Sequence, residues 1–109
     1  MPYRIPSRER PVDTLSGGQK VITTAGSEGQ LASSTSCLGV LITAKPANTG
    51  NVYLGWDNTV SSTAGTYGKL LAAGEDVWLP VDDPSKVWLD VSVNGEGVDF
   101  FIIKDTQTD

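Results

Sequence analysis

The sequence predicts a single all-β domain, either a β-sandwich or a jelly-roll-like barrel of about six to eight antiparallel strands, with an extended N-terminal arm. Short segments rich in Val and Thr alternate with clusters of Gly, Asn, Ser and Pro, which is the pattern of strands and turns. Helix signals are almost absent. The length of 109 residues and the hydrophobic content of 39% suit one small domain with its own core.

Residues 1–18 are predicted to form the extended arm, and residues 19–109 the folded domain. Prolines are spaced along the arm at Pro2, Pro6 and Pro11. Each proline is incompatible with a regular helix and places the preceding residue in an extended conformation. The segment Ser16-Gly17-Gly18 is predicted to be a hinge between arm and domain.

The arm carries side chains suited to contact with another protein. They are Tyr3, Arg4, Ile5, Arg8 and Arg10. The apolar side chains would gain free energy by burial, and a guanidinium group pairs well with a carboxylate. We therefore expect an arm that docks on a protein partner, with a flexible terminus as the alternative.

Strand candidates follow one another through the rest of the chain. They cover residues 19–25, 37–45, 51–57, 75–81, 86–93 and 98–104, with weaker extended stretches at 30–33 and 66–73. The run 37–42 is apolar on both faces, which is typical of a strand in the middle of a sheet. The turn residues 46–50 predict that 37–45 and 51–57 pair as an antiparallel hairpin.

A second hairpin is predicted near the C-terminal end. Residues 86–93 alternate between aliphatic and other side chains, and Asn94-Gly95 supplies the positive φ of a tight turn. Residues 98–104 then form the second strand of the hairpin. This strand is apolar on both sides beyond Asp99, so we expect the arm or a second sheet to cover it.

The aromatic residues Trp78, Trp88 and Tyr53 are candidates for a partner contact. Each tryptophan stands between two aliphatic residues, so alternation places it on the face opposite its neighbours. If the aliphatic side chains face the core, both tryptophans face outward on adjacent strands and form an apolar patch with Tyr53. The alternatives are that this face is covered and the aromatic residues are core, or that the tryptophans stack on carbohydrate.

The sequence predicts a protein that is not an enzyme and that needs no metal or cofactor. The chain has no histidine, the commonest general base and zinc ligand, and its single cysteine, Cys37, opens an apolar strand. Neighbouring acids such as Asp82-Asp83 are best explained as a turn whose carboxylates accept backbone hydrogen bonds. Asp90 and Asp99 are expected on a solvated face.

The charge distribution bears on possible partners. The net charge is −5, and the first twenty residues carry four basic and two acidic side chains, a net of +2, which leaves −7 on the remainder. An acidic body repels nucleic acid and anionic membrane surfaces, so neither is an expected partner. The start of the chain lacks the apolar run of a signal peptide, and we expect the protein to fold where it is made.

Three stretches carry a resemblance to small structural proteins of tailed-bacteriophage virions. They are residues 37–44 (CLGVLITA), 46–55 (PANTGNVYLG) and 71–83 (LAAGEDVWLPVDD). The chain resembles these proteins over about two thirds of its length, from Cys37 to Ile103, through turn and strand motifs that identify no active site.

The resemblance implies a head-decoration, or cement, protein of the capsid surface, made in the cytoplasm of a host bacterium. It implies the major capsid protein as partner and a homo-oligomer, with a trimer favoured. The arm would then dock on the shell, and Trp78 and Trp88 would pack between copies. A head-tail connector, tail or head-fibre component of the virion is an alternative, and a carbohydrate-binding β-sandwich module is an alternative from another class.

Overall fold

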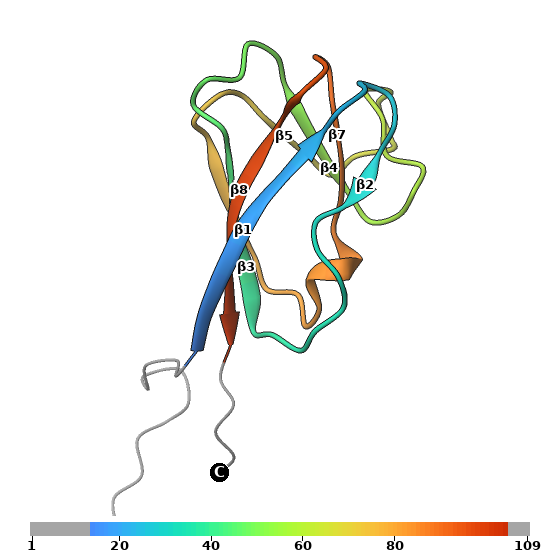
Figure 1. The fold of residues 1–109 in the computed structure, drawn as a ribbon. Coiled ribbons are helices and arrows are strands. Elements are labelled where there is room, and N and C mark those ends of the chain that lie inside the picture. Colours follow the sequence, from blue (N-terminus) through green and yellow to red (C-terminus); the bar gives the residue numbers. More distant parts are fainter. Residues whose placement is uncertain (1–13, 105–109) are drawn as a thin grey trace, which may run out of the picture.

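The computed structural model describes residues 14–104, which form two antiparallel four-stranded sheets and one 3-10 turn. The elements are β1 (Thr14–Ile22), β2 (Gly29–Gln30), β3 (Gly39–Ala44), β4 (Val52–Gly55), β5 (Lys69–Leu71), β6 (Asp76–Leu79), η2 (Pro84–Lys86), β7 (Trp88–Val91) and β8 (Glu96–Lys104). Sheet A has the order β1-β8-β3-β6, and sheet B has the order β2-β7-β4-β5 (Figure 1). The predicted all-β class is therefore confirmed. The arm residues Tyr3, Arg4, Ile5, Arg8 and Arg10 lie outside the described residues.

The strands pair as the two arms of one long folded ribbon. The first described strand pairs with the last, β2 with β7, β3 with β6, and β4 with β5, all antiparallel. These four pairs alternate between the sheets: β1–β8 and β3–β6 lie in sheet A, and β2–β7 and β4–β5 lie in sheet B. Only the β4–β5 connection joins strands within one sheet, and every other connection crosses between the sheets.

One hydrophobic core is shared by the two sheets. Sheet A contributes Val40, Ile42, Ala44, Val98 and Ile102, and sheet B contributes Val52, Leu54, Leu71, Leu89 and Val91. Along β3 the buried residues alternate with half-buried ones, as expected for a strand with one face in the core. Burial of a side chain of this size stabilises a fold by about 1.5–3 kcal/mol.

We call a connection that passes from one sheet to the other a crossover. Because the strands pair in order from the two ends of the chain, two crossovers run side by side in opposite directions, and hydrogen bonds join them to each other or to a neighbouring strand. The Ala25 N–H donates to Asn94 Oδ1 at 2.7 Å, which joins the β1–β2 and β7–β8 crossovers. The β3–β4 crossover is joined to the start of β8 by Glu96. That carboxylate accepts the Thr49 N–H at 2.7 Å and the Gly50 N–H at 2.9 Å, which lowers its pKa.

Asp83 joins the β2–β3 and β6–β7 crossovers. Its carboxylate accepts the Ser34 hydroxyl at 2.6 Å and the Ser85 N–H at 2.9 Å, and it caps the 3-10 turn η2. These hydrogen bonds, that of Ser34 first, lower the pKa of Asp83 to about 2. The predicted carboxylate that accepts backbone amides in this turn is confirmed for Asp83, whereas the Asp82 carboxylate pairs with the Lys86 ammonium.

Both predicted hairpins are wrong. Strand β3 lies in sheet A and β4 in sheet B, and likewise β7 lies in sheet B and β8 in sheet A. The turn residues at 46–50 and 94–97 are real, but they belong to crossovers between sheets. Each strand has one apolar face that must be buried against the other sheet, and the turn chemistry does not distinguish a hairpin from a crossover.

The predicted hinge at Ser16-Gly17-Gly18 is also wrong. These residues lie within β1 and pair with Phe100, Phe101 and Ile102 of β8. Gly17 has a packing reason to lack a side chain, because an added Cβ would overlap the Phe100 carbonyl. The described part of the predicted arm, from Thr14 onward, is therefore strand paired with the domain.

We expect Asp83→Asn to reduce stability at neutral pH and to change how stability depends on acid. The lowered pKa means that the folded state binds a proton less well than the unfolded state. The contribution of Asp83 is therefore present above pH 4 and is lost as the pH falls from about 4 to about 2. Denaturant unfolding of both proteins between pH 7 and pH 2 should give curves that converge at the acid end.

The matched control is Asp82→Asn, at the neighbouring position, where the carboxylate contacts the exposed Lys86 ammonium at 2.7 Å. Its unfolding should follow the wild-type pH profile. A gap between Asp83→Asn and the wild type that stays constant down to pH 2 would contradict the role given to the Asp83 carboxylate.

Candidate interaction surface

An apolar row crosses the outer face of sheet A, with an exposed aromatic residue at each end and a half-buried leucine between them. Trp78 of β6 is in register with Leu41 of β3, and Leu41 with Phe101 of β8. Their strand neighbours Val40, Ile42 and Ile102 are buried in the core, so alternation turns the row outward. Trp78 is 48% exposed and Phe101 49% exposed, although both are large apolar side chains.

Leu15 extends this row toward one end of the sheet. It pairs with the half-buried Ile103 on β8 and is itself 59% exposed. We call Leu15, Leu41, Trp78 and Phe101 the sheet A patch. A contiguous set of exposed apolar side chains on a soluble domain usually marks a contact with a partner or ligand.

Two glycines lie beside the sheet A patch, one on β3 and one on β1. The Trp78 ring lies against Gly39 of β3, where an added Cβ would overlap it. At the other side of the row, Phe101 faces Gly17 of β1, which has no side chain to cover it. The Trp78 ring therefore lies against bare backbone at one end of the row, and at the other end β1 presents no side chain beside Phe101.

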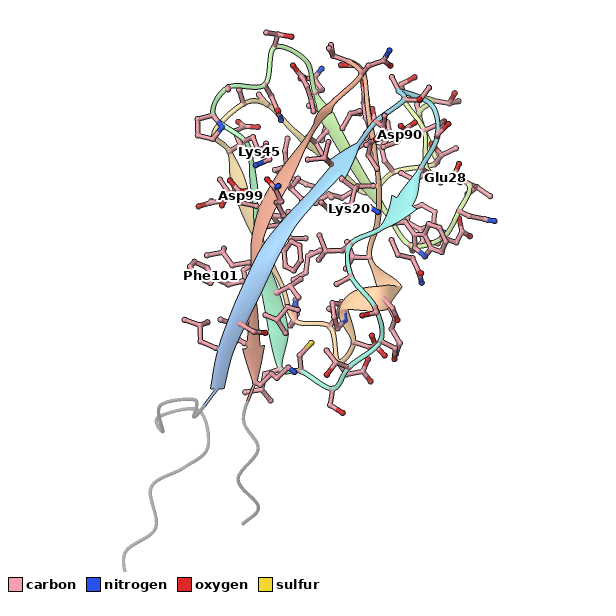
Figure 2. The ribbon with its side chains drawn as sticks, in the orientation of Figure 1. Lys20, Glu28, Lys45, Asp90, Asp99 and Phe101 are labelled. Atoms are coloured by element: carbon pink, nitrogen blue, oxygen red, sulfur yellow. The ribbon has the colours of Figure 1, made fainter. Side chains whose placement is uncertain are left out.

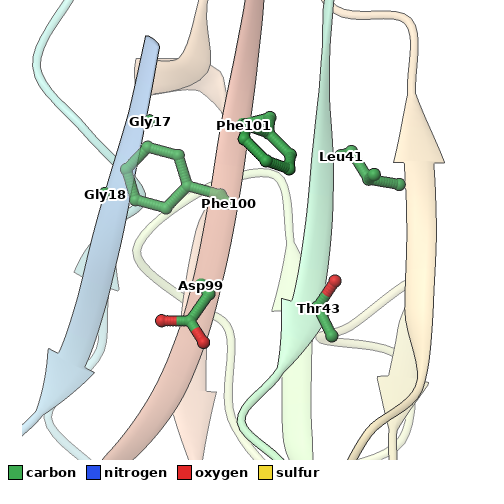
Figure 3. A pocket seen from close by; sticks show the side chains of 7 residues that line it. All are labelled: Gly17, Gly18, Leu41, Thr43, Asp99, Phe100 and Phe101. Carbon is green, nitrogen blue, oxygen red and sulfur yellow. The ribbon is translucent and has the colours of Figure 1, made fainter.

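A shallow depression of about 390 Å³ opens beside the row (Figure 3). It is lined by Gly17, Gly18, Leu41, Thr43, Asp99, Phe100 and Phe101. Figure 3 shows Phe101 and Leu41 next to each other, whereas Phe100 turns toward the two glycines of β1. The lining is largely apolar, which suits an inserted side chain of a partner better than a charged ligand.

Charged side chains bound the patch on the side away from Leu15. Asp99 and Lys45 form an ion pair at 2.9 Å on the outer face, and both are labelled in Figure 2. Asp99 is registered with Thr43, and Thr43 with Asp76 at the edge of the sheet. The surface therefore has an apolar centre and a polar border, as protein interfaces do.

The two tryptophans singled out by sequence do not share a patch. Trp78 lies on β6 in sheet A and Trp88 on β7 in sheet B, because the 80–87 segment carries the chain from one sheet to the other. The alternation itself is confirmed at Trp88, whose neighbours Val87 and Leu89 are buried. Trp88 is half-buried.

Tyr53 also does not join the exposed surface. It lies on β4 in sheet B, only 8% of its surface is exposed, and its ring centroid is 5.1 Å from that of Tyr67. The 56–68 loop supplies Tyr67 as a cover, which strand alternation alone does not predict. Sequence reasoning also missed the sheet A contributions of Leu15, Leu41 and Phe101, because their meeting depends on strand order.

Trp56 is a second exposed aromatic residue that sequence reasoning did not single out. It is 58% exposed and follows β4 directly. With Lys69 and Lys86 it lines a depression of about 270 Å³ in which Leu54 and Val87 also take part. This depression shares no residue with the sheet A patch, so Trp56 can serve as a control position in tests of the patch.

Two of the titratable groups that the sequence singled out, Asp90 and Cys37, have structural partners. Asp90 is buried, not on a solvated face as expected, and accepts the Gly26 N–H at 2.9 Å and the Val91 N–H at 2.8 Å. Burial raises the pKa of the Cys37 thiol, whose Sγ lies 3.2 Å from the Val81 carbonyl. Within residues 14–104 no group of three acidic or cysteine side chains is placed to hold a metal ion.

Comparisons with known proteins add no relative: no family model, no curated protein and no solved structure matches the chain. Among the helical residues that the structure describes, no segment has the length and hydropathy needed to cross a membrane.

We expect the sheet A patch to contribute little to folding. Phe101→Ser should change the free energy of unfolding by less than about 1 kcal/mol, because cross-strand pairs on an exposed face are worth about 0.2–1 kcal/mol. Ile102→Ser, one residue along β8, should cost several times more because it removes a core side chain and buries a hydroxyl. Denaturant unfolding measures both; equal losses would contradict an outward-facing, structurally dispensable Phe101.

Proposed function

We propose that this protein is a structural protein of a bacteriophage virion, a capsid decoration (cement) protein that binds the assembled shell and bridges neighbouring capsid subunits. The proposal rests on the outward-facing row of Trp78, Leu41 and Phe101, whose two aromatic side chains are exposed on a sheet that needs none of the three for its core. The resemblance of residues 37–103 to small virion proteins supplies the partner, the major capsid protein. The virion surface is the corresponding location.

We also infer that the fold is a jelly roll. Eight strands in two sheets, paired first with last and so on inward to β4 with β5, are what results when a long antiparallel ribbon is rolled up. The part of the predicted arm, residues 1–18, that precedes β1 is kept in the proposal as a further contact with the shell.

A cement role suits a surface of this kind because binding that selects the assembled state stabilises it by mass action. Each contact can be modest. The aromatic side chains of the patch are the type that dominates protein interfaces, and many copies on one lattice add their contributions. The body remains acidic and is not suited to nucleic acid.

Self-association is part of the proposal, with a trimer as the state that the resemblance favours. A head-tail connector, tail or head-fibre component using the same surface is the second candidate within the virion. The carbohydrate-binding alternative loses its two-tryptophan platform, because Trp78 and Trp88 lie in different sheets. One exposed tryptophan, Trp78, in one sheet and one half-buried tryptophan, Trp88, in the other make a weaker sugar site.

The copy number of the chain in purified virions distinguishes these candidates. Quantitative mass spectrometry against the major capsid protein should give hundreds of copies per particle if the chain decorates the whole shell. A dozen or so copies would place it in the connector or tail. Its absence from the particle would overturn the proposal, and the sheet A patch would then have to bind a partner outside the virion.

We expect the double substitution Trp78→Ser with Phe101→Ser to weaken binding to the shell at least tenfold. The reason is that large aromatic residues at the centre of an interface typically carry more than about 1.4 kcal/mol each. The measurement is co-sedimentation of the purified protein with shells that lack it, over a range of concentrations. Binding that is undiminished in the double variant would remove the patch from the interface.

The matched control is Trp56→Ser, which removes an equally exposed tryptophan outside sheet A. It should bind shells like the wild type. Circular dichroism of all variants before binding checks that each remains folded.

A further inference from the structure

Strand β1 lies at the edge of sheet A, and within residues 14–104 no strand pairs with its outer side. It is nine residues long, and positions 15–19 are all exposed. A proline or a charged side chain is the usual means of keeping an edge strand from pairing, and β1 contains no proline. Its one charged side chain, Lys20, is half-buried and lies on the same face as the core residue Val98 with which it pairs, so the outer face of β1 carries no charge. The edge is therefore open to another strand.

The hydrogen bonds of β8 decide which backbone groups of β1 point to this free edge. The Lys45 N–H donates to the Gly97 carbonyl at 3.1 Å, so Gly97 turns its backbone groups toward β3. Backbone groups alternate in direction along a strand, so the even-numbered residues of β8 turn toward β1 and bond its even-numbered residues. The groups on the free edge belong to Leu15, Gly17, Gln19 and Val21.

We propose that β1 pairs with β1 of a second copy of this chain, antiparallel across a two-fold axis at Gly18. In this register Leu15 lies opposite the partner's Val21, and Gly17 lies opposite the partner's Gln19. The four residues whose backbone groups point to the free edge, Leu15, Gly17, Gln19 and Val21, then all form hydrogen-bonded pairs with the second copy. Centring the pair on Gly17 or on Gln19 would leave Val21 or Leu15 opposite a residue beyond β1.

The side chains of β1 complement themselves in the same register. Leu15 is 59% exposed and Val21 37% exposed, and the pairing places each against the other on the outer face. Lys20 lies opposite the partner's Ser16, so the two lysines stay apart. A second copy of this chain is thus the occupant whose backbone and side chains both fit this edge.

The dimer joins the two A sheets into one sheet of eight strands, with both sheet A patches on the same side. Opposing residues of an antiparallel pair lie on one face, and Leu15 and Val21 both belong to the outer face. The dimer itself does not depend on the virion role. That it presents two shell-binding patches together rests on the proposed function, and it differs from the trimer implied by the resemblance.

Sedimentation equilibrium of the full chain, without any shell, tests the dimer. We expect a mass twice the 11.5 kDa of the chain. Leu15→Lys or Val21→Glu alone should weaken dimerisation at least tenfold, and the two substitutions together should restore it because opposite charges then face each other at both ends. A monomer, a trimer, or single variants that dimerise like the wild type would overturn the proposal, while leaving shell binding to be judged by co-sedimentation.

Disulfide formation tests the two-fold position directly, in a Cys37→Ser background that removes the natural thiol. Gly18→Cys should give a covalent dimer on mild oxidation, because paired Cα atoms at such a position lie about 4.5 Å apart. Its added Cβ would lie 3.6 Å from Phe100, an ordinary contact. The matched control Ser16→Cys should stay unlinked, because the two positions would be about 13 Å apart. Equal linking at both positions would overturn the register.

Discussion

The hydrogen bonds between paired crossovers are the constraint on which the rest of this structure depends. Because the chain folds as one long ribbon and then rolls, each passage from sheet to sheet occurs beside a second passage in the opposite direction. The backbone amides of these passages cannot join a strand ladder, so they need other acceptors. Asn94, Asp90, Glu96 and Asp83 supply them from the partner passage or from a neighbouring strand, to the amides of Ala25, Gly26, Thr49 and Thr35 in that order.

Polar side chains in this protein therefore act mainly as structural elements. Asp90 is buried on β7, and its carboxylate accepts a hydrogen bond from the Gly26 N–H of the β1–β2 crossover. Asp83 holds Ser34 of one crossover and caps the 3-10 turn of the other. The outer face of sheet A combines an apolar row with a polar border of Thr43, Asp76 and the Asp99–Lys45 ion pair.

The sequence allowed the class of fold and the inward or outward direction of many side chains to be predicted, because both follow from local patterns. Alternation correctly placed Val87 and Leu89 in the core. Strand partners could not be predicted in the same way. Asn94-Gly95 has the chemistry of a hairpin turn, yet Gly95 donates its N–H to the carbonyl of Ile22, the last residue of β1. Only the burial of both sheets against each other decides between the two outcomes.

The candidate surface was predictable only in part for the same reason. Trp78 could be identified as outward-facing, but its neighbours Leu41 and Phe101 come from strands far along the chain. Tyr53 was expected outside and is covered by Tyr67, since a loop closes over it. A surface assembled across strands depends on their order, and single-strand patterns contain no information about order.

The pairing of the first described strand with the last has a consequence for the timing of folding. Strand β8 is the centre of sheet A, between β1 and β3, and its residues are translated after those of every other strand. Until residue 104 has left the ribosome, β1 has no partner and sheet A cannot close. Folds dominated by such distant pairings form slowly, in milliseconds to seconds. The row of Trp78, Leu41 and Phe101 is thus created only when synthesis of the domain is finished, so a nascent chain cannot engage a partner through it prematurely.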